Sequence, residues 1–149
     1  MRAVVQRTKG ASVKIEGEEI SSIKYGIVVF LGVEKNDDDA AAAYLADKIV
    51  NLRIFEDNQD KMNLSLIDVQ GEVLSVSQFT LLADCRKGRR PGFSEAAPPE
   101  EAENLYKKFN IFLRDKSVVV KEGVFQANMQ IELINDGPVT ILLDSKKTF

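Results

Sequence analysis

The segment from Gly26 to Val33 constrains the fold more than any other part of the chain. Its residues, Gly-Ile-Val-Val-Phe-Leu-Gly-Val, include no polar side chain. A strand with one solvated face alternates polar and apolar residues, whereas a continuous apolar run is typical of a strand buried on both faces. We therefore expect a sheet that is covered on both sides. The 149 residues suffice for such a core, and we expect residues 1–149 to form a single domain.

The remaining pattern predicts a sheet-rich α/β protein with two main helices. One helix begins at Asp37 or Asp38, residues suited to cap a first turn, and extends to about Asn51. The second opens at Pro98-Pro99, where the missing N–H of proline does no harm. Its apolar face is expected to comprise Leu105, Phe109, Phe112 and Leu113. The further strands are expected at residues 2–8, 52–55, 73–79, 118–120, 128–134 and 139–143. Residues 13–20 are expected to form either a strand or a hairpin with Gly17 near its turn.

The hexapeptide Asn135–Thr140, Asn-Asp-Gly-Pro-Val-Thr, combines turn residues with the start of a strand-like apolar run. Two interpretations are open. Composition alone favours an ordinary hairpin turn. Alternatively, the Gly137-Pro138 bond is a candidate cis peptide, since only X-Pro bonds adopt cis at low cost. Gly137 also lacks a Cβ, so its backbone can approach a ligand closely.

A second motif follows the strand-like residues Val73–Val76. Ser77, Gln78 and Thr80 carry hydroxyl or amide groups and flank Phe79. Polar residues at such a place can simply form the solvated face of a strand. Alternatively, a strand end presents its backbone N–H groups and hydroxyls to a substrate. The sequence of this segment leaves both interpretations open.

Missing residue types exclude several kinds of chemistry. The chain has no histidine and a single cysteine, Cys85. A Ser-His-Asp triad, a Cys-His pair and a zinc site are therefore excluded within one chain. No phosphate-binding glycine motif is present, and we expect neither a metal nor a cofactor. A lone cysteine and the lack of a long apolar run favour the cytoplasm and no membrane partner.

A short basic segment stands out against a net charge of −3. Arg86, Lys87, Arg89 and Arg90 supply four cations within five residues. Most short charge runs are solvated loops, but contact with RNA needs only a local basic patch. Because the run directly follows the Ser77–Leu81 motif, we consider both interpretations open. We expect no DNA partner.

The two motifs resemble the signatures of the D-aminoacyl-tRNA deacylases, also called D-tyrosyl-tRNA deacylases. Other segments resemble that family in the same order along the chain. One departure is Gly92, where the resemblance leads us to expect serine. The expected fold is therefore deacylase-like, with mixed, barrel-like and layered sheets and two main helices. The other similar segments are Val5–Arg7, Ala11–Val13, Leu31–Lys35, Arg53–Phe55, Lys61–Leu64 and Phe125–Met129.

The resemblance implies hydrolysis of the ester bond in D-aminoacyl-tRNA, and in glycyl-tRNA mischarged on tRNA-Ala, with L-aminoacyl-tRNA spared. It also implies a homodimer in which Gly137-Pro138, in cis, enters the active site of the other subunit. Arg7 would hold that motif. Phe125 and Met129 would pack near the terminal adenine of the acceptor end, although both could equally be core residues.

The resemblance also implies catalysis without an indispensable side-chain nucleophile. The aminoacyl ester is labile, and a ribose 2′-hydroxyl beside it can help to activate water. The backbone N–H of Phe79 is expected to stabilise the oxyanion, with Ser77 and Gln78 shaping the pocket. Thr80 is expected to be a positioning residue rather than a nucleophile that attacks the ester. The alternatives are a non-catalytic RNA-end or nucleotide-binding module that uses residues 86–90, and a Thr80-dependent hydrolase of another ester.

Overall fold

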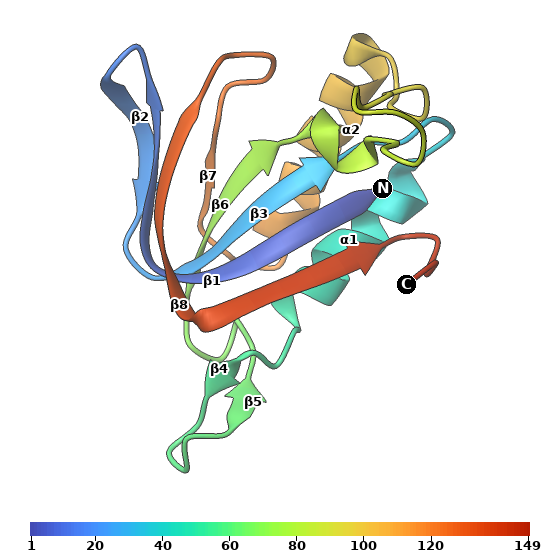
Figure 1. Ribbon diagram of the computed structural model, residues 1–149. Coiled ribbons are helices and arrows are strands. Elements are labelled where there is room, and N and C mark those ends of the chain that lie inside the picture. The colour runs from blue at the N-terminus through green and yellow to red at the C-terminus, as the bar shows by residue number, and fades with distance from the viewer.

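The computed structural model describes residues 1–149 and contains a six-stranded sheet, a two-stranded sheet and two α-helices. The larger sheet is strongly curved, and α1 and α2 lie together on one side of it (Figure 1). The predicted fold class, a sheet-rich and barrel-like α/β arrangement with two main helices, is confirmed.

The large sheet is mixed, as expected. Strand β1 pairs antiparallel with β2, β3 and β8, whereas β3–β6 and β6–β7 are parallel pairs. The parallel pairs place the carboxyl ends of β3 and β6 at the same edge of the sheet. The strands of this sheet are β1 (Arg2–Ile15), β2 (Glu18–Ile23), β3 (Gly26–Gly32), β6 (Glu72–Ser77), β7 (Val120–Glu122) and β8 (Gln130–Asp144).

Strand β3 is buried on both faces, which confirms the prediction from its apolar run. Ile27, Val29 and Leu31 join the larger core cluster, which also contains buried residues of both helices. Val28 points to the opposite side and joins a smaller cluster formed with β1, β2 and β6. A strand between two clusters has no solvated face, and this is why it carries no polar side chain.

The helices begin close to the predicted positions. Helix α1 spans Asp39–Val50, and the carboxylate of Asp38 accepts from the backbone N–H of Ala41 at 2.9 Å. Helix α2 spans Pro99–Arg114. Of its predicted apolar face, Phe109 and Leu113 are fully buried, whereas Leu105 and Phe112 are partly buried at the edge of the core.

Several predicted strand boundaries are wrong. Strand β1 extends beyond the predicted segment 2–8 to Ile15 because its second half pairs with β2. The two strands form the hairpin that one interpretation of residues 13–20 predicted, with Gly17 in its turn. Only Phe55 of the segment 52–55 is extended. It begins β4 (Phe55–Glu56), which pairs with β5 (Met62–Leu64) in a small projecting hairpin (Figure 1). Strand β6 ends at Ser77 and is followed by a short 3₁₀ helix, η1 (Phe79–Leu82). Strand β7 begins two residues later than the segment 118–120 predicts.

The interpretation of Asn135–Thr140 as a hairpin turn is wrong. Residues on both sides of it belong to the one strand β8 and pair with the same strand β1. Thr8 lies opposite Asn135 and Gln6 opposite Thr140, so residues 136–139 bulge out opposite Arg7 alone. The Gly137-Pro138 peptide bond within this bulge is cis. The turn residues therefore form a four-residue bulge in a continuous strand.

Candidate functional site

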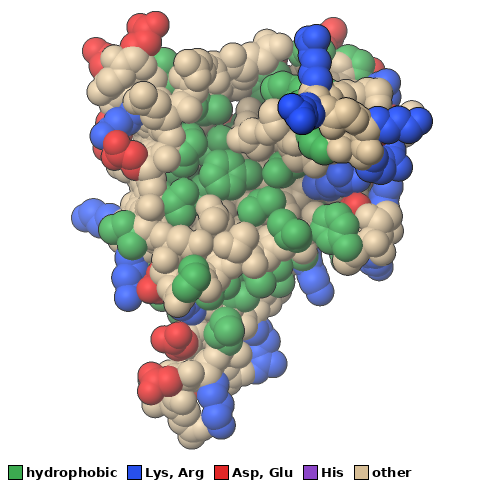
Figure 2. Space-filling view, viewed as in Figure 1, with side chains coloured by type: hydrophobic (Ala, Val, Ile, Leu, Met, Phe, Trp, Pro, Cys, Tyr) green, Lys and Arg blue, Asp and Glu red, His purple; other side chains and the backbone are tan.

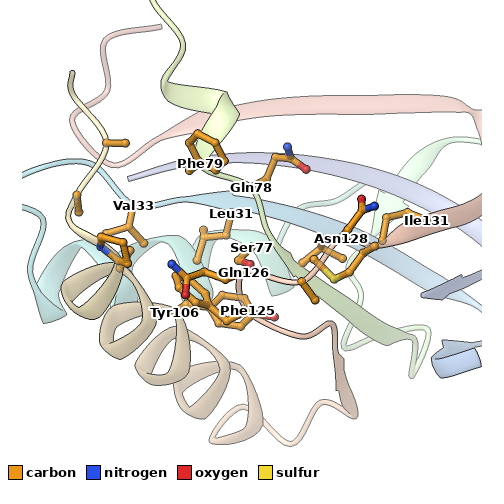
Figure 3. Close-up of a pocket in the computed structure, with 17 residues that line it drawn as sticks. Leu31, Val33, Ser77, Gln78, Phe79, Tyr106, Phe125, Gln126, Asn128 and Ile131 are labelled. Carbon is orange, nitrogen blue, oxygen red and sulfur yellow. The ribbon is translucent and has the colours of Figure 1, made fainter. Parts of the chain in front are cut away.

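A cavity of about 760 Å³ opens at the carboxyl ends of β3 and β6. Its walls come from the start of α2 and from residues 125–129, which follow β7 (Figure 3). Most of its lining is apolar, and the polar groups are hydroxyls and amides. Ligands of α/β proteins commonly bind at the carboxyl ends of parallel strands, in a mostly apolar cavity with few polar groups.

Three of the four predicted catalytic residues line this cavity: Ser77, Gln78 and Phe79. The backbone N–H of Gln78 donates to the carbonyl of Leu31 at 2.8 Å, which fixes the end of β6 to the end of β3. The backbone N–H of Phe79, the first residue of η1, makes no hydrogen bond within the chain. The first N–H groups of a helix lack partners inside that helix. The Phe79 N–H is thus free to donate to a bound molecule.

Thr80 lies outside the cavity lining and is exposed. Its hydroxyl oxygen accepts a hydrogen bond from the Gln78 side-chain amide. An amide donor cannot accept the hydroxyl proton, so nothing in this contact activates Thr80 as a nucleophile.

Phe125 and Met129 line the cavity, and both also pack against core clusters. The rings of Phe125 and Tyr106 are neighbours, with centroids 6.2 Å apart. The backbone N–H of Gly123 donates to the carbonyl of Ser75 at 2.9 Å and ties this segment to β6. Phe125 and Met129 therefore each contact the cavity on one side and the protein interior on the other.

Tyr106 is a cavity residue that the sequence did not reveal. Its hydroxyl donates to the carbonyl of Ser75 at 2.8 Å, and burial raises the pKa of the phenol. A single tyrosine on the apolar face of an amphipathic helix is not distinguishable from an ordinary core residue by sequence. Gln126 and Asn128 were also missed, and they add two exposed side-chain amides to the cavity (Figure 3). Both amides lie in the segment Phe125–Met129, where the resemblance assigned roles only to Phe125 and Met129. Nothing in the spacing of polar residues distinguishes the two amides in the sequence.

Arg7, Gly137 and Pro138 do not line this cavity. The bend of β8 that contains the bulge lies at one end of the sheet, and η1 lies toward the other (Figure 1). Gly137 and Pro138 are exposed, whereas the side chain of Arg7 is only 5% exposed. Within one chain, the structure therefore does not bring the predicted selectivity motif to the predicted catalytic residues.

The bulge is held by specific hydrogen bonds. Arg7 donates from Nη1 to the carbonyl of Ile54 at 2.7 Å and from Nε to the carbonyl of Asp136 at 3.2 Å. The side-chain oxygen of Asn135 accepts from the backbone N–H of Val139 at 3.1 Å. Gly137 has a φ of +121°, a conformation that residues with a Cβ rarely adopt. These contacts account for arginine, asparagine and glycine at their positions.

The basic residues Arg86, Lys87, Arg89 and Arg90 form an exposed loop between η1 and α2. Asp84 and Gly92 close this loop through two backbone hydrogen bonds of 2.7 and 2.9 Å. Figure 2 shows a gathering of Lys and Arg side chains on the upper right of this face of the molecule.

The four cations are not equivalent. Arg86 donates to both carboxylate oxygens of Asp84, at 2.9 and 2.8 Å, and this contact holds the pKa of Asp84 well below its ordinary value. Lys87, Arg89 and Arg90 have no carboxylate partner. Three of the four predicted tRNA-binding cations are thus available for phosphate, and the fourth is neutralised locally.

The structure contains no group of three or more His, Cys, Asp and Glu side chains that could hold a metal ion. Neither helix is long and apolar enough to cross a membrane.

Known structures share this fold. A protein named c-Myc DNA Unwinding Element Binding Protein superposes with a TM-score of 0.91 at 46% identity, over 97% of this chain and 98% of that one. A probable eukaryotic D-amino acid tRNA deacylase superposes with a TM-score of 0.80 at 17% identity, over 95% of this chain and 97% of that one. At 17% identity this second likeness shows the fold alone.

Sequence comparison defines the family. Residues 4–144 match the family described as D-Tyr-tRNA(Tyr) deacylase. The D-aminoacyl-tRNA deacylase of Thermosipho africanus is 56% identical over 149 residues, which cover the whole of both chains. This chain therefore belongs to the D-Tyr-tRNA(Tyr) deacylase family, and the resemblance inferred from its motifs is confirmed.

Proposed function

We propose that this protein hydrolyses the ester bond of D-aminoacyl-tRNA and releases the free D-amino acid and tRNA. The observation that carries the proposal is the free Phe79 N–H beside the apolar cavity, in a chain whose relatives are named D-aminoacyl-tRNA deacylases. Such a donor stabilises the negative charge that develops on the carbonyl oxygen during ester hydrolysis. One well-placed donor contributes roughly 10²–10³ in rate.

The residues that line the cavity offer no side-chain base. Tyr106 is the one lining residue with a titratable side chain, and its hydroxyl is already donated to Ser75. Burial raises its phenol pKa, so it stays protonated at neutral pH. We therefore assign activation of water to the ribose 2′-hydroxyl beside the ester. Ser77 and Gln78 orient the ester, and Thr80 takes no covalent part.

Chiral selection is assigned to a second copy of the chain. The cavity contains no carboxylate that could hold the substrate ammonium group. The exposed, firmly held Gly137-Pro138 lies outside its own cavity, and this is consistent with insertion into the cavity of a partner. Its carbonyls would bind the ammonium group and occupy the space that an L side chain needs. Glycine has no side chain to reject, so glycyl-tRNA mischarged on tRNA-Ala would also be hydrolysed.

With the ester placed in the cavity, contacts to the rest of the tRNA acceptor end can be assigned. Phe125 and Met129 would contact the terminal adenine, and the loop of residues 86–90 would bind phosphates. The protein would act as a homodimer of single-domain chains in the cytoplasm, where aminoacyl-tRNA is used.

The test is a comparison of D-tyrosyl-tRNA and L-tyrosyl-tRNA hydrolysis by the purified protein. We expect rapid loss of the D ester and negligible loss of the L ester above the spontaneous rate. Equal rates would exclude chiral selection. Binding of the acceptor end without turnover would instead support the alternative of a non-catalytic RNA-end-binding module, which the exposed basic loop favours.

A further inference from the structure

Two exposed phenylalanines lie in edge-to-face contact beside the cavity. The ring centroids of Phe79 and Phe93 are 4.9 Å apart, with an angle of 63° between the ring planes. Phe79 is 59% exposed and Phe93 is 38% exposed. Phe79 lines the cavity and Phe93 does not, so the pair extends the apolar surface from the cavity mouth outward.

This aromatic pair adjoins the basic loop. Phe93 follows Gly92, whose two backbone hydrogen bonds to Asp84 close the loop. Lys87, Arg89 and Arg90 lie within that closed loop and have no carboxylate partner. Hydrophobic side chains lie next to the gathering of Lys and Arg in Figure 2. The cavity, the aromatic pair and three free cations thus follow one another on one surface.

The order of these features matches the chemistry of a single-stranded nucleotide. Bases of single-stranded RNA bind by stacking on aromatic side chains, and their phosphates bind to nearby Lys and Arg. Neither ring belongs to a core cluster, so folding alone does not account for two exposed aromatic residues here. A second copy of the chain could also cover the rings, but it would not account for the free cations.

We propose that the ring of Phe93 stacks on the unpaired base that precedes the terminal adenosine, with Phe79 supporting that ring in edge-to-face contact, while Lys87, Arg89 and Arg90 bind the phosphates beyond the base. This inference rests on the proposed function, because the cavity is taken to hold the terminal aminoacyl-adenosine. It assigns to Phe93 a part in binding the acceptor end that is separate from the reaction.

The decisive experiment pairs two substrates with a conservative variant. Phe93→Leu keeps an apolar side chain and removes the aromatic face. D-tyrosyl-adenosine carries the same ester as D-tyrosyl-tRNA but lacks every preceding nucleotide. We expect Phe93→Leu to raise KM for D-tyrosyl-tRNA by roughly 5- to 150-fold, the range measured for loss of one stacked base. Its kcat, and both constants for D-tyrosyl-adenosine, should stay unchanged, and Phe93→Trp should restore KM.

Other outcomes overturn the inference. Equal losses on both substrates would mean that Phe93 shapes the cavity. A change in oligomeric state by analytical ultracentrifugation would mean that the pair is an interface between copies. No change on either substrate would leave Phe93 without a part in binding. Phe149→Leu, at another phenylalanine that is 66% exposed, is the matched control and should affect neither substrate.

A binding measurement separates this inference from the proposed function. An uncharged acceptor-end oligonucleotide with 2-aminopurine in place of the base before the terminal adenosine reports stacking by fluorescence quenching. Quenching by the wild-type protein, lost in Phe93→Leu and kept in Phe93→Trp, supports the stacking site even if no ester is hydrolysed. Hydrolysis of D-tyrosyl-tRNA without such quenching would overturn the stacking site and leave the proposed function intact.

Discussion

Arg7 donates from Nε to the backbone carbonyl of Asp136 at 3.2 Å, one residue before Gly137. The same guanidinium donates from Nη1 to the carbonyl of Ile54 at 2.7 Å, next to β4. One buried side chain therefore joins three segments that are far apart in sequence: β1, the β4–β5 hairpin and the bulge of β8. The rigidity of an otherwise exposed bulge depends on this fork of donors.

Arg7→Lys should weaken both folding and substrate binding. Lysine keeps the charge but cannot donate to the two carbonyls in the fork geometry of arginine. Loss of hydrogen bonds from a charged group predicts a stability decrease of about 2–3 kcal/mol. We also expect a higher KM for D-tyrosyl-tRNA. The two measurements are the thermal unfolding midpoint, which reports stability, and the KM.

Lys9→Gln is the matched control for that variant. Lys9 binds the side-chain carboxylate of the same Asp136 at 3.0 Å, but its side chain is 64% exposed. An exposed ion pair contributes little, so both stability and KM should change only slightly. Equal effects of the two variants would contradict the special role of Arg7.

Gly137→Ala should disturb the bulge and substrate binding together. A Cβ at this position would lie 2.9 Å from Val139 Cγ2 and 3.0 Å from Arg7 Nη2, at a φ of +121°. We expect a stability loss of about 1–3 kcal/mol from the unfavourable backbone conformation. Gly17→Ala is the control, since Gly17 has a φ of +87° with no atom within 4 Å of the new Cβ. It should lose stability without any change in KM, whereas Gly137→Ala should raise KM.

Thr80→Ala should leave most of the hydrolytic activity. The hydroxyl accepts a hydrogen bond from the Gln78 amide and lies outside the cavity lining. We expect kcat for D-tyrosyl-tRNA to stay within about tenfold of the wild-type value, equivalent to no more than about 1.4 kcal/mol. Thr80→Ser, which keeps a hydroxyl, should match the wild type. A loss of several orders of magnitude in Thr80→Ala alone would indicate a covalent nucleophile.

Salt dependence should distinguish the cations of the basic loop. Arg89 has no carboxylate partner, whereas Arg86 is bound to Asp84. Arg89→Gln should therefore reduce the slope of log KM against log salt concentration by about 0.7, the loss of one phosphate contact on a single strand. Arg86→Gln should change the slope less. Equal slopes in wild type and Arg89→Gln would identify the loop as simply solvated.

The pKa of Asp84 tests the contact that neutralises Arg86. Hydrogen bonds from Arg86 lower this pKa from its ordinary value of 3.8. Because the folded-state pKa is depressed, the contact stabilises the protein above the ordinary pKa, and this contribution is lost as pH falls toward the depressed value. Carboxyl NMR titration should give a midpoint below 3.8 in the wild type, and Arg86→Gln should raise it.

The sequence predicted those features that depend on residues close together in the chain. The apolar run of β3 required burial on both faces, and Asp38 capped α1 as its short polar side chain suggested. The bulge in β8 was not predicted, because its residues favour a turn locally and only pairing with β1 on both sides keeps the strand continuous. The contact between Phe79 and Phe93 depends on how the intervening loop closes, which no local spacing reveals.

The bulge of β8 also makes the number of residues in its motif as important as their identity. Ile131 and Leu133, before the bulge, pack against the smaller core cluster, and Ile141 and Leu143, after it, pack against the larger one. Both halves are held in register by β1. Removing one residue between them would shift one half by one position and turn its apolar side chains to the opposite face. A substitution in the bulge acts at its own position, whereas a change in the length of the bulge would misplace every apolar side chain of one half of the strand.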